Sequence, residues 1–337
     1  MGGVVTTQSL TSAIGLEFAD SELEAAMRVG LDTVEGELRA AVASADPFVT
    51  EAARHLLEAG GKRVRPMLTL LAAHFGDPTA PLVVPSALVL ELTHLATLYH
   101  DDVMDEAAVR RGAPSANSRW TNTVAILTGD YLFAKAASIA AELGTEAVRI
   151  QAETFARLVQ GQIRETVGPR AGVDPVAHHL DVHRDKTGSL IATCCRFGAL
   201  FGGADDKVTD TVTQFGEVFG IAFQLSDDLL DIASESVYSG KVPGTDLREG
   251  IATLPVLYAL EGPDNRLRQL LAQGPLTDDA EHAEALGLLR RSPAMDRARA
   301  TLEDYASEAR RLLGELPDVP ARQALASMCD FVTARMA

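Results

Sequence analysis

The sequence predicts an all-α protein, and three observations support that prediction. Apolar residues recur at spacings of three and four along most of the chain of 337 residues, which is the pattern of helices that bury one face. Clusters of glycine and proline separate these segments. No segment combines sustained two-residue alternation with β-branched enrichment, as a half-buried strand would. Hydrophobic residues make up 47% of the chain, which is ample for a buried core.

The expected helices follow one another from residue 23 onward. The first spans residues 23–42 and has an amphipathic pattern. The others span residues 67–75, 85–105, 122–143, 145–167, 178–201, 206–232, 254–260, 266–273, 281–291 and 294–316. Breakers lie between them, as at residues 60–61, 76–78, 112–114, 168–169, 202–203 and 262–263. No linker or repeat marks a boundary, so we expect one domain over residues 21–337 after a flexible tail of residues 1–20.

The charge balance excludes one class of partner. The chain has 30 Lys and Arg against 47 Asp and Glu, a net charge of −17. Nucleic-acid binding draws its affinity from Lys and Arg on phosphates, so we expect no nucleic-acid partner. A small anionic substrate remains compatible with this charge, because local cations can reverse the field in one cleft.

Cysteine content and hydropathy point to a cytoplasmic protein. Three cysteines cannot form a disulfide framework, which favours a reducing compartment. The most apolar stretch, residues 81–99, is interrupted by Pro85, Glu91 and His94. We therefore expect no transmembrane segment.

Two aspartate motifs carry the strongest chemical signal. HDDVMD (100–105) and SDDLLD (226–231) both contain DDxxD and both end an apolar helical stretch. The first and last aspartates of each motif lie roughly 40° apart on one helix face. A solvated acidic helix end is the simpler alternative, but Asp at a helix C-terminus opposes the dipole. Oxygen-only ligands favour Mg²⁺, which usually shares its shell with substrate phosphates. The motifs therefore predict a phosphorylated ligand.

Basic residues near these motifs predict a second way of binding anions. A glycine-led cluster, GGKRVRP, occupies residues 60–66. Arg110 and Arg111 follow the first motif, Lys186 lies in another helical segment, and Lys241 follows the second motif. Together with the aspartates they indicate two anionic subsites, one reached through metal ions and one through Lys and Arg directly.

A histidine pair is a weaker signal. His179 and His183 are four residues apart, a spacing that can chelate a metal on one helix face. No third ligand is evident nearby in the sequence, so a surface or packing role is favoured.

As a set, six motifs resemble the trans-isoprenyl diphosphate synthases of the polyprenyl synthetase family. In family order they are GGKRVRP (60–66), HDDVMDEAAVRRGAP (100–114), GDYLFAKA (129–136), KTGSL (186–190), FQLSDDLLD (223–231) and GKVPGTDLREG (240–250). The resemblance implies an all-α isoprenoid synthase fold around a deep central cavity, with the two aspartate motifs facing each other across its mouth. It also implies a homodimer that condenses isopentenyl diphosphate head-to-tail with an allylic diphosphate.

The resemblance further implies a role for each site residue. Asp101, Asp105 and Asp227 would ligate three Mg²⁺ ions. Asp102, Asp228 and Asp231 would support them. The allylic diphosphate would be bound by Arg110, Lys186, Thr187, Gln224 and Lys241. Isopentenyl diphosphate would be bound by Lys62, Arg65, His94 and Arg111. In the family a lysine usually follows the closing Glu-Gly of the last motif, whereas here the residue is Ile251, which removes one cation.

The residues before the first aspartate motif bear on product length. In the family, bulky aromatic side chains at the fifth and fourth positions before the motif close the cavity. Here these positions are Ala96 and Thr97, so we expect a long product, hexaprenyl to decaprenyl diphosphate. A geranylgeranyl diphosphate synthase and a catalytic subunit of a heteromeric synthase are the alternatives. A class I terpene synthase fits less well, because such enzymes usually lack the GGKRVRP and RRG segments.

Overall fold

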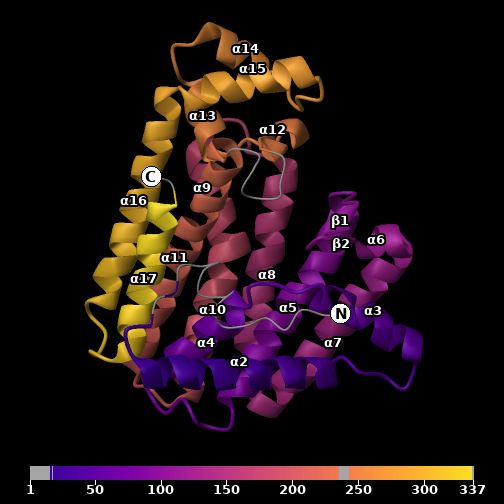
Figure 1. Ribbon diagram of the computed structural model, residues 1–337, viewed down its shortest axis with the longest axis vertical. Coiled ribbons are helices and arrows are strands. Elements are labelled where there is room, and N and C mark those ends of the chain that lie inside the picture. Colours follow the sequence, from indigo (N-terminus) through magenta and orange to yellow (C-terminus); the bar gives the residue numbers. More distant parts are fainter. Residues whose placement is uncertain (1–15, 17, 235–242, 336–337) are drawn as a thin grey trace. The chain divides into compact units, whose positions relative to one another are not determined.

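The computed structural model describes residues 16, 18–234 and 243–335 and confirms the all-α fold (Figure 1). The chain divides into two compact units. Unit 1 comprises Met1–Ala156, Leu190–Gly216 and Leu313–Met328, and unit 2 comprises Arg157–Ser189, Glu217–Leu312 and Cys329–Ala337. The single domain over residues 21–337 stays a prediction, and so does its tail, since residues 1–15 and 17 lie outside the described part of the chain.

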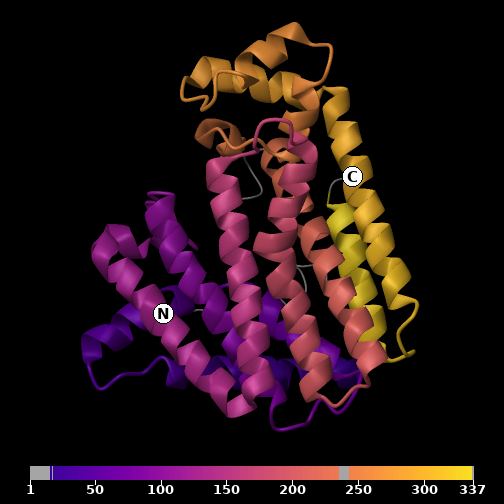
Figure 2. The same ribbon diagram turned by 180° about the vertical axis from the view of Figure 1, so that it is seen from behind.

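Unit 1 is built around a helix that is buried on nearly every side. Its helices include α2 (Ser21–Ala41), α3 (Pro47–Glu58), α4 (Val64–Ala73), α5 (Val83–Met104), α6 (Ala116–Arg119) and α7 (Asn122–Leu143). The central one is α5, which packs against α2, α4 and α7 (Figures 1 and 2). Burial on all sides explains why its sequence is almost continuously apolar.

The first expected helix is confirmed as α2. The Asp20 side chain caps it by accepting hydrogen bonds from the backbone N–H groups of Glu22 and Leu23. Its buried residues form one stripe, Leu23, Met27, Leu31, Val34 and Leu38. The amphipathic pattern therefore located this helix correctly.

Sequence patterns missed the helices α3, α6, α12 (Thr245–Glu249) and α17 (Pro320–Ala334). The signal for α3 was present: Asp46 caps the amides of Phe48 and Val49, and Pro47 occupies the first helical position. The helices α6 and α12 span four and five residues, which is too short for a periodicity to develop.

A two-stranded hairpin follows the first aspartate motif. Strand β1 (Val109–Arg110) pairs antiparallel with β2 (Ala113–Pro114), and Arg110 lies opposite Ala113. The two turn residues, Arg111 and Gly112, have φ values of 54° and 75°. Two positive φ angles define a type I′ turn. The hairpin thus places two consecutive arginines beside the end of α5.

Unit 2 contains a break in an expected helix. In place of the expected helix 178–201 the chain has α9 (Pro175–His183), the π-helical segment η1 (Arg184–Gly188) and α10 (Ser189–Phe201). Of these, α9 and η1 belong to unit 2, whereas α10 belongs to unit 1 from Leu190 onward. The helix α8 (Thr145–Val167) passes close to η1 at Gly161. A Cβ at this position would lie only 2.8 Å from the backbone N of Lys186, so a glycine is needed there. Single π-turns occur frequently at functional sites, and this one carries Lys186 and Thr187.

The helices of unit 2 beyond η1 contain or follow the second aspartate motif. They are α11 (Asp206–Ala233, from Glu217 onward), α12, α13 (Leu254–Leu260), α14 (Asn265–Leu271), α15 (Asp279–Arg290) and α16 (Pro293–Leu313). The helices α13, α14 and α15 pack against one another (Figure 1). All expected helices in this region are present.

One helix of the described residues, α7, is long and apolar enough to cross a membrane by length and composition. Its Ala125, Leu132 and Ala136 are buried within unit 1. A single helix of this kind is weak evidence for a membrane span, because core helices of soluble proteins meet the same criteria.

Candidate active site

The first aspartate motif closes helix α5 with carboxylates in different environments. Asp102 is fully buried, and its Oδ1 accepts a hydrogen bond from Nε of Arg110 at 2.5 Å. Asp105 is the C-cap residue, is 56% exposed, and lies 3.6 Å from Nη2 of Arg110. Asp105 N donates to the carbonyl of Asp101 at 2.8 Å. Asp102 thus anchors the hairpin arginine, and Asp105 presents its carboxylate to solvent.

An arginine cluster, defined as Arg63, Arg65, Arg110 and Arg111, surrounds His94 in unit 1. Burial is the largest cause that holds the pKa of His94 well below its ordinary 6.5, and the positive charges of the cluster add to it. The imidazole is therefore neutral at pH 7. The structure thus places one neutral ring close to four guanidinium groups.

Within this cluster Arg63 belongs to the fold. Its guanidinium donates to Glu35, to Glu91 at 3.2 Å and to the carbonyl of Leu57 at 2.9 Å. Burial alone lowers the pKa of Arg63, but the two carboxylates outweigh burial and raise it. With its donors engaged, Arg63 holds the GGKRVRP segment in place.

Arg65 and Arg111 are held differently. Burial lowers the pKa of both, and Glu91 opposes that effect. Nε of Arg65 is buried and has no hydrogen-bond partner among the described residues. Arg111 donates to the carbonyl oxygens of Leu56, at 2.8 Å, and Gly60. Lys62 is exposed. Of the residues predicted for isopentenyl diphosphate, His94, Arg65 and Arg111 are therefore neighbours within unit 1, and Nε of Arg65 is available to donate.

Glu91 is the residue that sequence reasoning missed. It is 1% exposed, and its carboxylate acts on Arg63, Arg65 and Arg111 alike. The signal was available, because an acid in the middle of an apolar helix needs a buried cation nearby.

The three carboxylates of the second motif have three separate sets of partners. Asp227 is paired with Nη2 of Arg335 at 2.7 Å and is 45% exposed. Asp231 accepts hydrogen bonds from the backbone N–H groups of Thr245 and Asp246, at 3.2 and 3.1 Å, and so holds the start of α12. Asp228 is buried and faces histidines. Of the three side chains, that of Asp227 is the most accessible.

Thr187, Gln224 and Asp228 form a hydrogen-bonded chain in unit 2. Thr187 Oγ1 donates to Oε1 of Gln224 at 3.2 Å, and Nε2 of Gln224 donates to Oδ1 of Asp228 at 3.1 Å. Nearby on η1, Nζ of Lys186 donates to Oε2 of Glu165 at 2.5 Å. The structure thus brings three predicted residues together, while Lys241 lies outside the described residues.

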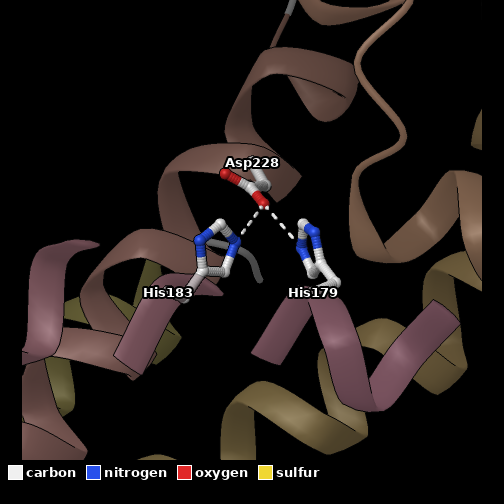
Figure 3. Close-up of side chains that lie close together, drawn as sticks. All are labelled: His179, His183 and Asp228. Atoms are coloured by element: carbon white, nitrogen blue, oxygen red, sulfur yellow. Dashed lines mark hydrogen bonds and ion pairs between the residues drawn. The ribbon is translucent and has the colours of Figure 1, made fainter. Parts of the chain in front are cut away.

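His179 and His183 approach the other oxygen of Asp228 (Figure 3). Burial raises the pKa of Asp228, but the two imidazoles outweigh burial and hold the pKa below its usual range. Burial is also the main cause that lowers the pKa of His179. Asp228 is therefore an ionised carboxylate in the fold's interior.

The positions predicted to set product length lie on α5. Ala96 is fully buried, and Thr97 Oγ1 donates to the carbonyl of His94 at 2.8 Å. Ile251, which stands in place of the usual lysine, is 41% exposed. The deep central cavity stays a prediction.

Comparisons with known proteins identify the family. The model of the family named Polyprenyl synthetase matches residues 46–289. The chain belongs to the polyprenyl synthetase family. The predicted family and the prenyltransferase class are confirmed.

Two relatives and one solved structure illustrate the range of the family. A nonaprenyl diphosphate synthase of Mycobacterium tuberculosis is 52% identical over 329 residues, covering 96% of this chain and 98% of the relative. A heptaprenyl diphosphate synthase component 2 of Geobacillus stearothermophilus is 40% identical, covering 90% and 95%. A geranylgeranyl pyrophosphate synthase of Corynebacterium glutamicum, solved with calcium and isoprenyl diphosphate, is 44% identical, with a TM-score of 0.85 and coverage of 95% and 99%.

Proposed function

We propose that this polyprenyl synthetase condenses isopentenyl diphosphate head-to-tail with an allylic diphosphate and makes a long-chain trans-polyprenyl diphosphate. The observation that carries the proposal is the composition of the two aspartate motifs. Each offers an exposed terminal carboxylate, Asp105 or Asp227, while the buried aspartates of the same motifs hold cationic or polar neighbours in place. The arginine cluster around neutral His94 accompanies them, and we assign it to the second diphosphate.

The donor set fits a hard divalent cation. We propose Asp101, Asp105 and Asp227 as Mg²⁺ ligands, three ions in all, because carboxylate oxygens are the ligands that Mg²⁺ prefers. Asp102, Asp228 and Asp231 act behind them, since each is engaged by protein groups. When bound, the metal neutralises the diphosphate and makes it a better leaving group. The calcium and isoprenyl diphosphate in the Corynebacterium glutamicum enzyme support divalent-metal use.

The side chains of the allylic subsite stabilise the departing diphosphate. Arg110, Lys186, Thr187, Gln224 and Lys241 bind it, and hydrogen bonds from cationic donors strengthen as charge develops on the leaving oxygens. Lys186 exchanges Glu165, its partner in the free protein, for the diphosphate. The allylic C–O bond breaks, and its electron pair leaves with the diphosphate.

The second subsite positions the nucleophile. Lys62, Arg65, His94 and Arg111 bind the diphosphate of isopentenyl diphosphate. Its double bond attacks the allylic carbocation, and a proton leaves to the departing diphosphate, so no side-chain base is required. Neutral His94 donates one N–H to an anionic oxygen without adding a charge that would repel the arginines. Apolar helices keep water away from the cation.

Small residues on α5 support a long product. Ala96 and Thr97 leave the wall before Asp101 without an aromatic side chain, and the nonaprenyl diphosphate synthase relative is 52% identical. Geranylgeranyl diphosphate is the alternative product, because the geranylgeranyl pyrophosphate synthase from Corynebacterium glutamicum is also similar to this chain. We also propose a cytoplasmic homodimer, with the three buried free cysteines in keeping with a reducing compartment.

The test is an assay of the purified single chain with farnesyl diphosphate, radiolabelled isopentenyl diphosphate and Mg²⁺, with products separated by chromatography. We expect products of six to ten isoprene units and complete loss of activity on chelation. Asp101→Asn and Asp227→Asn should lose at least about a hundredfold in kcat. The control is Asp210→Asn, since Asp210 is an exposed aspartate on α11. This variant should keep the kcat of the parent protein. A dominant geranylgeranyl product would refute the long-chain assignment.

A heteromeric synthase is the second candidate, favoured by the similarity to the heptaprenyl diphosphate synthase component 2. The same assay separates the two. Activity of the single chain supports the homodimer, whereas activity that appears only after addition of a second subunit supports the heteromer.

A further inference from the structure

Three side chains in unit 2 converge on one point beside the second aspartate motif (Figure 3). His179 and His183 lie one turn apart on α9, and Asp228 belongs to α11. Nε2 of His183 lies 3.0 Å and Nε2 of His179 lies 3.3 Å from the same Oδ2 of Asp228. One candidate ligand atom from each residue lies within 4.8 Å of the other two. Helical spacing and a carboxylate from a second helix thus gather two nitrogens and one oxygen.

The cluster is removed from solvent, and its two histidines share one carboxylate oxygen. The side chains of His183 and Asp228 are 7% and 8% exposed, and that of His179 is 11% exposed. His183 makes the hydrogen bond to Asp228. Nε2 of His179 is buried and lies 3.3 Å from that same Oδ2, so among the described residues it shares the oxygen that His183 already binds. Two buried ring nitrogens thus converge on one carboxylate oxygen, an arrangement in which a single ligand could lie between the three groups.

We propose that His179, His183 and Asp228 form a binding site for a transition-metal ion, for which Zn²⁺ is the best fit. Zn²⁺ accepts imidazole nitrogen and carboxylate oxygen at about 2.0–2.2 Å, so tetrahedral ligand atoms are separated by about 3.3 Å. The distance from His179, 3.3 Å, matches this separation, and the distance from His183, 3.0 Å, is slightly shorter. Three protein ligands leave the fourth position for water.

The site differs in chemistry from the carboxylates proposed for Mg²⁺. Imidazole nitrogen favours zinc, copper or nickel, whereas Mg²⁺ prefers oxygen. Asp228 already turns one oxygen to the histidines and the other to Gln224. A metal here would tie α9 to α11 directly before η1, which carries Lys186 and Thr187. Its effect is to hold that segment in place.

The experiment titrates the full-length protein with Co²⁺ in excess Mg²⁺, which occupies the oxygen sites. We expect a single equivalent of Co²⁺ to give the visible bands of tetrahedral coordination, and stoichiometric Zn²⁺ to abolish them. Zinc should also raise Tm, because it binds the folded state. His179→Gln and Asp228→Asn should each weaken Co²⁺ affinity by at least about tenfold.

Two matched controls separate this site from its neighbours. His178→Gln changes the adjacent histidine, whose Nε2 contacts the carbonyl of Arg164, and Asp227→Asn changes the adjacent motif carboxylate. Both should bind Co²⁺ as the parent protein does. Unchanged affinity in His179→Gln and Asp228→Asn, or equal loss in the controls, overturns the proposal.

Zinc-edge X-ray absorption of the unmodified, zinc-loaded protein tests the same site without any substitution. Its result therefore does not depend on whether the variants fold. Two imidazole ligands per zinc support the site, and oxygen-only coordination or absence of zinc binding refutes it. These measurements require no substrate. A negative result in the prenyltransferase assay therefore leaves the metal-site proposal intact, and a negative result in the metal-binding measurements leaves the prenyltransferase proposal intact.

Discussion

Replacing Glu91 by Gln tests how unit 1 supports its arginine cluster. Glu91 and Arg63 are 2% and 3% exposed at their side chains, and their atoms Oε1 and Nη1 are 3.2 Å apart. Removing the charge of Glu91 leaves the Arg63 guanidinium buried with less compensation. It also removes the carboxylate that acts on Arg65 and Arg111. The substitution should therefore destabilise the fold and strengthen the repulsion among the cations.

The size of the effect follows from the partners that remain. Breaking a buried ion pair by removing one member costs about 3–5 kcal/mol when the other charge is left unpaired. Arg63 keeps Glu35 and the carbonyl oxygens of Gly60 and Leu57. With these contacts intact, we expect a loss of about 2–3 kcal/mol in the free energy of unfolding.

Denaturant unfolding followed by tryptophan fluorescence measures this loss. Trp120 is the single tryptophan of the chain and lies in unit 1, as Glu91 does. Glu37→Gln is the control, because Glu37 is an exposed residue of α2 and surface substitutions change stability by less than about 0.5 kcal/mol. A loss below about 1 kcal/mol for Glu91→Gln, or one equal to the control, would refute the assigned role of Glu91.

Three further outcomes are expected. Because the pKa of His94 lies below 6.5 in the folded state, the unfolded chain binds the proton more readily, so stability should fall as pH drops below 6.5. His94→Gln should flatten that profile in unfolding measurements, and an unchanged slope would contradict it. Ala96→Phe should shorten the product without abolishing turnover, as chromatography of the products will show. Unchanged product length would contradict that role of the α5 wall. Arg335→Ala removes the partner of Asp227 and should lower the Mg²⁺ concentration for half-maximal activity; a higher requirement would count against metal binding at Asp227.

The sequence was sufficient for the all-α fold and the family. Helical periodicity is a local property, and α2 displays it because it buries residues at spacings of three and four. Capping residues such as Asp20 mark helix ends through contacts within a few positions of the chain. The motif order was readable for the same reason, since each motif is contiguous. Short elements, such as α12 and the β1–β2 hairpin, were not predicted because they contain too few residues to show a periodic pattern of apolar side chains.

Only tertiary structure decided which charges are available. Asp101-Asp102 and Asp227-Asp228 read as equivalent pairs in the sequence, yet Asp102 and Asp228 are buried against Arg110 and histidines. Those partners lie eight residues away for Asp102 and 45 for Asp228. Local pattern determines which face a residue occupies on its own helix. The neighbours that tune its charge are supplied by other helices, so their identity depends on packing that no local pattern encodes.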